Sequence, residues 1–316
     1  MASVLLIDTL HPVFAQILNE HGIEAVAGHH LTRETILETI STYEGIAIRS
    51  RFKLDADFLT QAQHLKCIGR AGAGMENIDL AVATKYGIQC VNAPEGNRDA
   101  VAEHAMGMLL MLMNHLRRAD NEVRNGIWKR EENRGTEIEG KTVGIVGFGN
   151  MGSSFARRLQ GFGVRVLALD PYKTIDIKMF PYVEQCTEEL FYKECDIVSL
   201  HIPLTKETYF LANDNWFNNF RKPIYFINTA RGKNTETAAL VRAMESGKVT
   251  GAALDVLEYE AVSFEHIDAS KLPEPFSYLI HSDRVVLSPH IAGWTHESNE
   301  KIARILAEKM VHVLKT

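Results

Sequence analysis

Thr142-Val-Gly-Ile-Val-Gly147-Phe-Gly149-Asn150-Met151-Gly152 stands near the middle of the chain and predicts a dinucleotide-binding fold. An apolar strand pattern runs into G-x-G-x-x-G, and a helical pattern follows over Ser153–Leu159. In such a fingerprint the first glycine makes the tight turn, the second lets a pyrophosphate approach the backbone, and the third lets the helix pack closely on the strand. Because 141 residues precede the segment, the dinucleotide-binding domain cannot be the whole chain.

The composition is typical of a globular chain that is long enough for two domains. The 316 residues are 46% hydrophobic and 23% charged, and the net charge is −6. Basic runs never exceed a pair, so nucleic acid and anionic membranes are not expected as partners. The four cysteines lack metal-ligand spacing, so no metal site is expected. The first apolar run, Val4–Ile7, is too short for a signal peptide, which favours the cytoplasm.

Short apolar runs alternate with helical patterns along the chain, which predicts the α/β class with parallel sheets. Before the fingerprint, the expected strands are Val4–Ile7, Ile46–Ile48, Lys66–Arg70 and Gln89–Val91, and the expected helices are Pro12–Glu20, Asp55–Ala62 and Leu80–Tyr86. After Gly140, the expected strands are Val143–Val146, Val164–Leu169, Ile197–Leu200, Ile224–Asn228, Gly251–Leu254 and Val285–Leu287. A helix over Ser298–Leu314 is expected to close the chain.

Two further segments carry predictions about packing. A long helix is expected from about Ala100 to Asn125, with Asp99 as its N-cap. Its apolar residues continue around most of its surface, so it should be covered by its own domain, by a second subunit, or by both. We therefore expect a homodimer through the 100–125 helix region. The segment Ala261–Ser282 has two prolines and little periodicity, which predicts a long loop.

Asp170 ends the second strand of the later series, eighteen residues beyond Gly152. An acid at this place can bond the ribose hydroxyls of the adenosine, and its charge would repel a 2′-phosphate. This favours NAD over NADP as the cofactor. The alternatives are a plain loop acid before Pro171, and NADP binding assisted by Lys173.

Further along, Arg231, Asp255 and His290 each follow a buried strand, and Glu260 lies just beyond Asp255. The planar fork of an arginine suits a carboxylate, and a histidine can exchange a proton near neutral pH. Each residue alone also has a structural interpretation, as an ion-pair partner, a solvated loop acid or a packed histidine. In succession, at the ends of strands in one sheet, they indicate a common ligand crevice.

The order of these residues resembles the D-isomer-specific 2-hydroxyacid dehydrogenases over essentially the whole chain. The segments Asn228-Thr-Ala-Arg-Gly232, Ala252-Ala-Leu-Asp-Val256 and Ser288-Pro-His-Ile-Ala-Gly293 match motifs of that family, and Ser199-Leu-His-Ile-Pro-Leu-Thr205 resembles its cofactor-contacting segment. Three earlier segments are most similar to the 3-phosphoglycerate dehydrogenase branch: Ile48-Arg-Ser-Arg51, Gly69-Arg-Ala-Gly-Ala-Gly74 and Val91-Asn-Ala-Pro-Glu-Gly-Asn97.

The resemblance implies NAD-linked interconversion of a D-2-hydroxyacid and its 2-oxoacid, with 3-phosphoglycerate as the first candidate and a place in serine biosynthesis. By the same resemblance His290 is the acid/base, Glu260 orients it, and Arg231 binds the substrate carboxylate and polarises the carbonyl. The implied cofactor contacts are Gly147, Gly149, Asn150, Met151, Gly152, Asp170, His201, Pro203, Thr229, Ala230, Arg231, Asp255, His290 and Gly293. The implied substrate contacts are Arg49, Ser50, Arg51, Gly72, Ala73, Gly74, Arg231 and His290, with Arg49 or Arg51 meeting a substrate phosphate.

The resemblance also implies two doubly wound, Rossmann-like domains with an active-site cleft between them. Residues 1–95 plus 291–316 would form a flavodoxin-like substrate-binding domain, and 96–290 the NAD-binding Rossmann domain. No serine-sensing regulatory domain is expected after the closing helix.

The sequence departs from the family pattern at Lys233-Asn-Thr-Glu-Thr237, at Phe52 and at Trp294, near where a substrate is expected. Two alternatives therefore stay open. One is a glyoxylate or hydroxypyruvate reductase that uses the same residues on a smaller substrate. The other is a non-catalytic NAD(H)-sensing interaction protein of the same fold.

Overall fold

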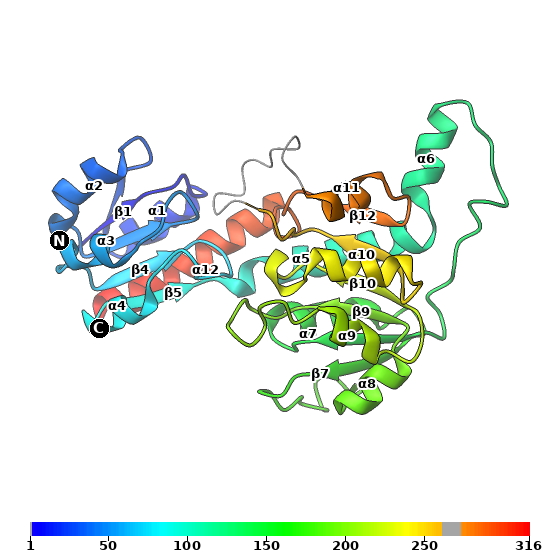
Figure 1. Cartoon of the computed structure of the whole chain (residues 1–316). Helices are drawn as coiled ribbons and strands as arrows, with labels where there is room; N and C mark the ends of the chain where they lie inside the picture. The colour runs from blue at the N-terminus through cyan, green and yellow to red at the C-terminus, as the bar shows by residue number, and fades with distance from the viewer. Residues whose placement is uncertain (1, 261–272) are drawn as a thin grey trace. The chain divides into compact units, whose positions relative to one another are not determined.

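The computed structural model describes residues 2–260 and 273–316. The chain forms two compact units, one made of Met1–Arg98 with Trp294–Thr316 and the other of Asp99–Gly293. Each unit contains one parallel sheet (Figure 1). The expected α/β class with two doubly wound parallel-sheet domains is thereby confirmed.

The first unit is built on a five-stranded sheet in the order β2-β1-β3-β4-β5. Flavodoxin-like folds use this order. The strands are β1 (Ser3–Leu6), β2 (Glu24–Ala27), β3 (Gly45–Ile48), β4 (Cys67–Arg70) and β5 (Gln89–Asn92). The helices are α1 (Val13–Glu20), α2 (Arg33–Thr39), the short η1 (Ile40–Thr42), α3 (Ala56–Gln61), α4 (Leu80–Lys85) and α12 (His296–Lys315). Because strand side chains alternate between faces, Val4 packs with α1 and α12, whereas Leu5 packs with α2, α3 and α4.

The second unit is built on a seven-stranded sheet in the order β12-β11-β10-β9-β6-β7-β8. Its strands are β6 (Thr142–Val146), β7 (Arg165–Leu169), β8 (Val183–Gln185), β9 (Ile197–Leu200), β10 (Ile224–Asn228), β11 (Val249–Leu254) and β12 (Val285–Leu287). The order reverses between β6 and β9, because β7 lies on one side of β6 and β9 on the other. Doubly wound sheets bind their ligands beyond the carboxyl ends of the strands at such a reversal.

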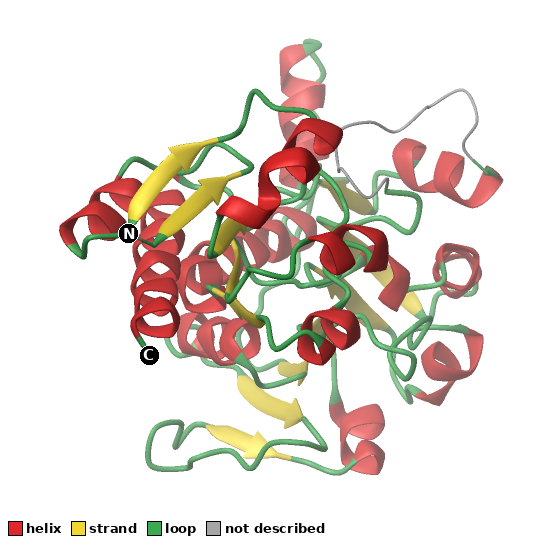
Figure 2. Ribbon diagram, turned by 90° about the vertical axis from the view of Figure 1, so that its left-hand side faces the viewer, coloured by secondary structure: helices red, strands yellow, loops and turns green. Residues whose placement is uncertain are grey.

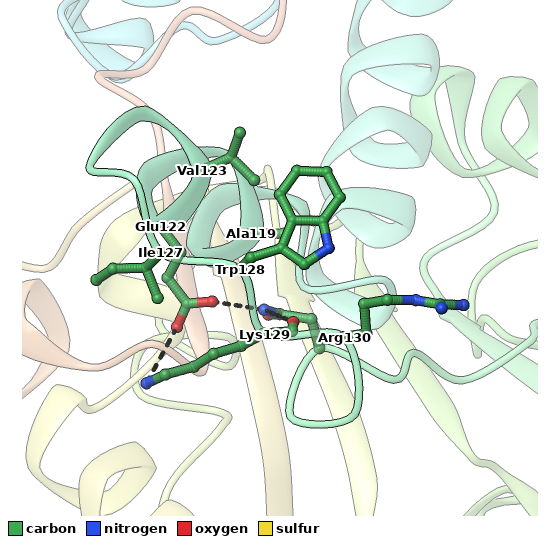
Figure 3. Close-up of a pocket in the computed structure, with 8 residues that line it drawn as sticks. Ala119, Glu122, Val123, Ile127, Trp128, Lys129 and Arg130 are labelled. Atoms are coloured by element: carbon green, nitrogen blue, oxygen red, sulfur yellow. Dashed lines mark hydrogen bonds and ion pairs between the residues drawn. The ribbon is translucent and has the colours of Figure 1, made fainter.

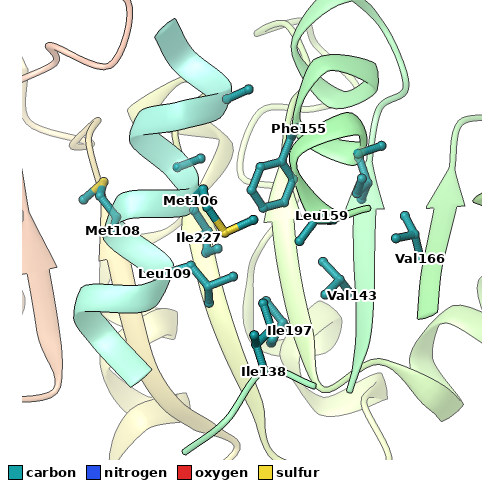
Figure 4. Close-up of a cluster of buried hydrophobic side chains, with 14 of the residues drawn as sticks. Met106, Met108, Leu109, Ile138, Val143, Phe155, Leu159, Val166, Ile197 and Ile227 are labelled. Carbon is teal, nitrogen blue, oxygen red and sulfur yellow. The ribbon is translucent and has the colours of Figure 1, made fainter. Parts of the chain in front are cut away.

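Helices cover both faces of this sheet. Figure 2 distinguishes the helices from the strands by colour. On one face α5 (Pro94–Met113) and α7 (Asn150–Leu159) bury Leu109 and Phe155 against Val143 and Ile197 (Figure 4). The other face is covered by α8 (Glu188–Glu194), α9 (Asp214–Asn219), α10 (Thr237–Glu245) and α11 (Glu274–His281). With both faces buried, the strands are apolar throughout, which is why they were visible in the sequence.

The expected helix Ala100–Asn125 with Asp99 as its N-cap is wrong. Helix α5 begins at Pro94, where a missing N–H costs nothing in the first turn, and ends at Met113. His115 then takes a left-handed φ of 53°, and a separate helix α6 (Leu116–Arg124) follows. The Met113 carbonyl accepts from Thr136 N instead of continuing the helix. The apolar residues of the expected helix were predicted to be covered by its own domain, by a second subunit, or by both. Most of those in α5 are buried in the core of its own domain.

The expected loop Ala261–Ser282 is wrong in its second part, whereas 261–272 lie outside the described residues. Residues Glu274–His281 form α11, with Phe276 and Leu279 buried three residues apart. Proline is favoured in a first helical turn, so Pro273 and Pro275 start the helix and do not prevent it. The short edge strands β2 and β8 were not predicted either. Within the described part of the chain, none of the helices combines the length and the apolarity that crossing a membrane requires.

Candidate active site

The carboxyl edge of the seven-stranded sheet gathers most of the expected site residues. Strands of a parallel sheet end at one edge, and every strand except β8 is followed there by at least one of them. They are Gly147–Gly152 after β6, Asp170 after β7, His201 and Pro203 after β9, Thr229–Arg231 after β10, Asp255 and Glu260 after β11, and His290 and Gly293 after β12.

The glycine loop has the geometry of a phosphate cradle. Gly147 has a left-handed φ of 86°, and a Cβ there would lie 2.7 Å from the His201 carbonyl oxygen. A Cβ on Gly152 would lie 2.1 Å from the Gly147 carbonyl oxygen, so this glycine lets α7 approach the loop. A Cβ on Gly149, by contrast, would meet no heavy atom within 4 Å. The space over Gly149, at the N-terminus of α7, fits a pyrophosphate.

Asp170 lies beside this loop. Its Oδ2 accepts from Phe148 N at 2.8 Å and its Oδ1 from Tyr172 N at 2.9 Å. Each carboxylate oxygen can accept a second hydrogen bond, so a diol such as a ribose can still be bound. Asn150 and Met151, both half-buried, form the first residues of α7 next to the loop.

Two buried polar atoms at this edge have no hydrogen-bond partner in the described structure: Thr229 Oγ1 and His201 Nδ1. Both belong to residues expected to contact the cofactor. His201 Nε2 lies 2.9 Å from Ser199 Oγ, and burial lowers the pKa of His201 to about 3, so the ring is neutral at physiological pH. Buried polar atoms without partners are rare, and a bound dinucleotide would supply partners here.

Arg231 stands in a turn that asparagine side chains shape. Asn228 Oδ1 accepts from Ala230 N at 2.9 Å, while Asn228 Nδ2 donates to the Arg231 carbonyl at 3.0 Å. Asn234, in the single turn η2 (Gly232–Asn234), accepts from Arg231 N at 3.1 Å. The Arg231 guanidinium donates through Nη1 to the Ala230 carbonyl at 2.7 Å.

Close backbone packing links the turn of Arg231 to the segment that carries Glu260, which in turn contacts His290. A Cβ on Gly232 would lie 1.9 Å from the Leu257 carbonyl oxygen, so only glycine fits at this approach. Leu257 N donates to Glu260 Oε1, and Glu260 Oε2 lies 2.8 Å from His290 Nδ1. The side chains of His290 and Glu260 are 26% and 14% exposed, so the pair is only partly accessible to solvent. The expected partnership of Glu260 with His290 therefore exists in the structure.

Asp255 fixes the loop that carries His290. The carboxylate is 1% exposed and accepts from Ile291 N and Ala292 N, both at 2.9 Å, and from Ser288 Oγ at 2.6 Å. The Asp255 carbonyl accepts from His290 N at 2.8 Å. These contacts hold His290 at a left-handed φ of 56°, which is unfavourable for a residue with a Cβ. Asp255 thus bonds protein groups of this loop, and the cofactor contact expected of it stays a prediction.

The other expected substrate residues lie in the first unit, after β3 and β4. Arg49 N donates to Asp8 Oδ2 at 2.5 Å, and Arg49 Nη2 donates to Asn299 Oδ1 at 3.2 Å. The Arg49 guanidinium carbon lies 5.1 Å from the centre of the Trp294 ring. Trp294, which departs from the family pattern, therefore stacks on Arg49 through a cation–π contact.

Arg51 is engaged differently. Its Nη1 donates to the Ile7 carbonyl at 3.1 Å and its Nη2 to the Leu31 carbonyl at 2.7 Å, so the guanidinium ties loops of the first unit together. Ser50 lies between the two arginines and is half-buried. Gly72 has a φ of 146°, and the carbonyls of Gly72 and Ala73 accept from Ala93 N at 3.0 Å and from Asn92 Nδ2 at 2.5 Å. Gly74, which ends the segment Gly72–Gly74, is buried.

The sequence interpretation missed the residues that hold this site in place: Asn228, Asn234, Ser288 and His104. Asn228 and Ser288 stand inside quoted motifs, but their side chains face other protein groups, which no periodicity reveals. His104 lies in α5, far from the site in the chain, and its Nε2 is 2.9 Å from Ser288 Oγ. Within residues 2–260 and 273–316, no group of histidine, cysteine and acidic side chains could hold a metal ion.

Comparison with known proteins gives consistent similarities. The sequence model of the D-isomer specific 2-hydroxyacid dehydrogenase, NAD binding domain, matches residues 106–292. The chain is 35% identical over 312 residues to a D-3-phosphoglycerate dehydrogenase of Archaeoglobus fulgidus, covering 99% of this chain and 57% of that protein. It is 37% identical over 289 residues to a glyoxylate reductase of Thermofilum pendens, covering 90% of this chain and 82% of that protein.

A solved structure gives the same result in three dimensions. The D-lactate dehydrogenase of Aquifex aeolicus, complexed with NAD and lactic acid, is 29% identical, with a TM-score of 0.81 over 99% of this chain and 94% of that one. The similar proteins thus act on different 2-hydroxyacids. The chain spans only 57% of the length of the curated 3-phosphoglycerate dehydrogenases that it matches.

Proposed function

Because the chain belongs to the D-isomer-specific 2-hydroxyacid dehydrogenase family, we propose that it interconverts a D-2-hydroxyacid and the corresponding 2-oxoacid. Its cofactor is NAD, since the matched residues 106–292 are the family's NAD-binding domain. The observation that carries the proposal is the contact between His290 Nδ1 and Glu260 Oε2 at 2.8 Å, on the sheet edge that also presents Arg231. When bound, NAD⁺ would accept the hydride during oxidation and NADH would supply it during reduction.

His290 is the proposed acid/base. Because Glu260 holds Nδ1, the ring orientation is fixed and Nε2 is the nitrogen that exchanges a proton with a substrate. A protonated ring would donate to the substrate oxygen during reduction, and a neutral ring would accept the hydroxyl proton during oxidation. Glu260 stabilises the protonated ring in both directions.

Arg231 is the proposed carboxylate-binding residue. Its guanidinium can bond both oxygens of a substrate carboxylate, and its charge can stabilise the negative charge that grows on the substrate oxygen as the hydride arrives. The turn fixed by Asn228 and Asn234 orients the side chain before substrate arrives. Asp170, the glycine loop, His201 and Thr229 would bind the cofactor.

We propose 3-phosphoglycerate as the first substrate to test, with Met1–Arg98 and Trp294–Thr316 as the substrate-binding domain. Arg49 is the better candidate for a substrate phosphate, since the Arg51 guanidinium already bonds three backbone carbonyls of its own domain. Replacing Arg49 with alanine should raise the KM for 3-phosphohydroxypyruvate at least tenfold, as expected for loss of a charged hydrogen bond, and leave glyoxylate unaffected. Arg51→Ala should lower thermal stability instead.

A glyoxylate or hydroxypyruvate reductase is the second candidate. The 37% identity to a glyoxylate reductase favours it, and the proposed catalytic residues are compatible with it. The purified protein with NADH should be assayed against 3-phosphohydroxypyruvate, hydroxypyruvate, glyoxylate and pyruvate. The highest kcat/KM for the phosphorylated acid would support the first candidate, and the highest for glyoxylate or hydroxypyruvate the second. NADH binding without turnover of any 2-oxoacid would contradict both and leave the NAD(H)-sensing interpretation.

We also propose that a second copy of the chain covers α6 and the segment after it. None of the α6 residues is buried, and Leu116, Val123, Ile127 and Trp128 are exposed apolar residues, Trp128 by 78%. Val123 and Trp128 line a cavity of about 220 Å³ (Figure 3). Glu122 also lines it, accepting from Asn133 Nδ2 and pairing with Lys129. An exposed apolar patch with a polar rim is typical of a protein interface.

Sedimentation tests this homodimer. The wild-type chain should sediment as a dimer, and Trp128→Glu should sediment as a folded monomer. A wild-type monomer at micromolar concentration would contradict the proposal. A cytoplasmic location and a place in serine biosynthesis stay predictions.

A further inference from the structure

We propose that His104 is a positioning residue for His290 and acts through Ser288 and Asp255. His104 lies in α5, whose apolar residues Ala105, Met108 and Leu109 are buried in the core of the second unit. The helix therefore presents the imidazole from a rigid support. The catalytic consequence of this proposal rests on the proposed function, but its structural part does not.

The directions of the hydrogen bonds follow from the groups involved. Ser288 Oγ lies 2.6 Å from Asp255 Oδ1, and an ionised carboxylate can only accept, so the hydroxyl donates to it. The hydroxyl has one proton, so its lone pairs must accept from His104 Nε2, which lies 2.9 Å away. His104 Nε2 therefore carries a proton. The chain of donors runs from His104 through Ser288 to Asp255.

Asp255 connects this chain of hydrogen bonds to the loop that carries His290. Its carboxylate is 1% exposed, so its charge depends on protein donors for stabilisation. Two of these donors, Ile291 N and Ala292 N, are the amides that follow His290. His104 Nε2 also lies 3.5 Å from Asp255 Oδ1, which places the imidazole to compensate the buried charge. Polarised donors strengthen one another along such a chain.

The loop needs this support because of its backbone conformation. His290 holds a φ of 56°, which a residue with a Cβ adopts only where surrounding contacts enforce it. When the donor from His104 is lost, Ser288 Oγ can rotate away from Asp255. The Asp255 carboxylate then loses the hydrogen bond that it accepts from this hydroxyl. The amides of Ile291 and Ala292 should then open more often, and the His290 ring should spend less time on Glu260.

The test compares His104→Leu, which removes the donor at similar volume, with His104→Gln, which restores a side-chain N–H. Hydrogen exchange followed by mass spectrometry reports opening of the 288–293 loop without any need for activity. Kinetics with the best 2-oxoacid substrate report the catalytic consequence. The control is His281→Gln, which changes a histidine of the same unit that bonds its own helix at Ser277 O.

In His104→Leu, exchange of the 288–293 peptide should be roughly tenfold faster, as expected for loss of one hydrogen bond in a charged chain, with other peptides unchanged. The kcat should fall with little change in the KM for NADH, and His104→Gln should recover most of both losses. Ser288→Ala, which also removes the donor to Asp255, should lose at least as much as His104→Leu, and the double variant should be no worse than Ser288→Ala. Unchanged exchange at 288–293, acceleration spread over the whole unit, or additive losses would each overturn the positioning role. An absence of turnover in the wild type would refute the proposed function, while the exchange result would still decide the inference.

Discussion

Two glycines of the G-x-G-x-x-G segment have different functions, one in folding and the other in the proposed binding of the cofactor. Replacing each with alanine should therefore have a different effect. Gly152 supports the packing of α7, since a Cβ there would lie 2.1 Å from the Gly147 carbonyl oxygen. Gly149 is not required for packing, since a Cβ there would meet no heavy atom within 4 Å. Its φ of −77° is one that alanine adopts without strain.

The expected magnitudes follow from these distances. In Gly152→Ala the loop or the helix must move by about 1 Å, and overpacking of this kind costs roughly 1–3 kcal/mol. For a domain of this size the midpoint of thermal unfolding should drop by about 2–12 °C. Gly149→Ala should leave that midpoint within about 1 °C. Its methyl group would occupy the space proposed for the pyrophosphate, and loss of charged hydrogen bonds there should weaken NADH binding at least about tenfold.

Thermal unfolding and NADH fluorescence titration measure the two effects on the same samples. Gly161→Ala is the matched control, because a Cβ on Gly161 also meets no heavy atom within 4 Å but lies after the far end of α7. It should change neither stability nor affinity. Normal NADH binding by Gly149→Ala would refute the assignment of the pyrophosphate to this loop. Wild-type stability of Gly152→Ala would refute the packing argument.

Three further predictions concern individual side chains. Glu260→Gln keeps an acceptor for His290 but loses the charge, so kcat in steady-state kinetics should fall about tenfold, and further in Glu260→Ala; wild-type turnover in both would exclude the pair from catalysis. Arg231→Lys keeps the charge but loses the fork, so kcat/KM for the 2-oxoacid should fall at least tenfold while NADH affinity by titration stays within about threefold; equal losses would contradict this. Burial lowers the pKa of His201 to about 3, below the value of about 6.5 expected in the unfolded chain, so the unfolded state binds the extra proton as pH falls between these values. The contribution of His201 to the free energy of unfolding, measured in urea, should therefore be full above pH 6.5 and decrease by about 1.4 kcal/mol per pH unit below it. The free energy of unfolding of His201→Asn should decrease less steeply with falling pH. Equal slopes for the wild type and His201→Asn would contradict a buried, neutral His201.

The seven-stranded sheet was largely predictable because its strands are buried on both faces and stand out as continuous apolar runs. The edge strands β2 and β8 were not, since they are short and less buried. The break after Met113 has no signal in the apolar pattern, because it depends on Thr136 taking the Met113 carbonyl. Local periodicity does not register a partner that lies twenty-three residues along the chain.

The candidate site divides in the same way. Arg231, Glu260 and His290 could be singled out because they follow buried strands of one sheet, and their proposed roles come from the family resemblance. The contacts of the Asp255 carboxylate with Ser288 and the amides of Ile291 and Ala292 could not be predicted, because they join residues 33 to 37 positions apart in the chain. Local sequence does not show which distant groups donate to a buried carboxylate.

In the proposed reaction, His290, Glu260 and Arg231 catalyse the reduction of a 2-oxoacid by NADH. The most direct measurement follows NADH consumption with each 2-oxoacid and, for every substrate except glyoxylate, whose product is achiral, determines the configuration of the product on a chiral column. We expect one 2-hydroxyacid to form per NADH consumed, with the D configuration where the product is chiral, and His290→Gln to lower the rate roughly 10²–10⁴-fold. An L-product, or near-normal turnover in His290→Gln, would contradict it.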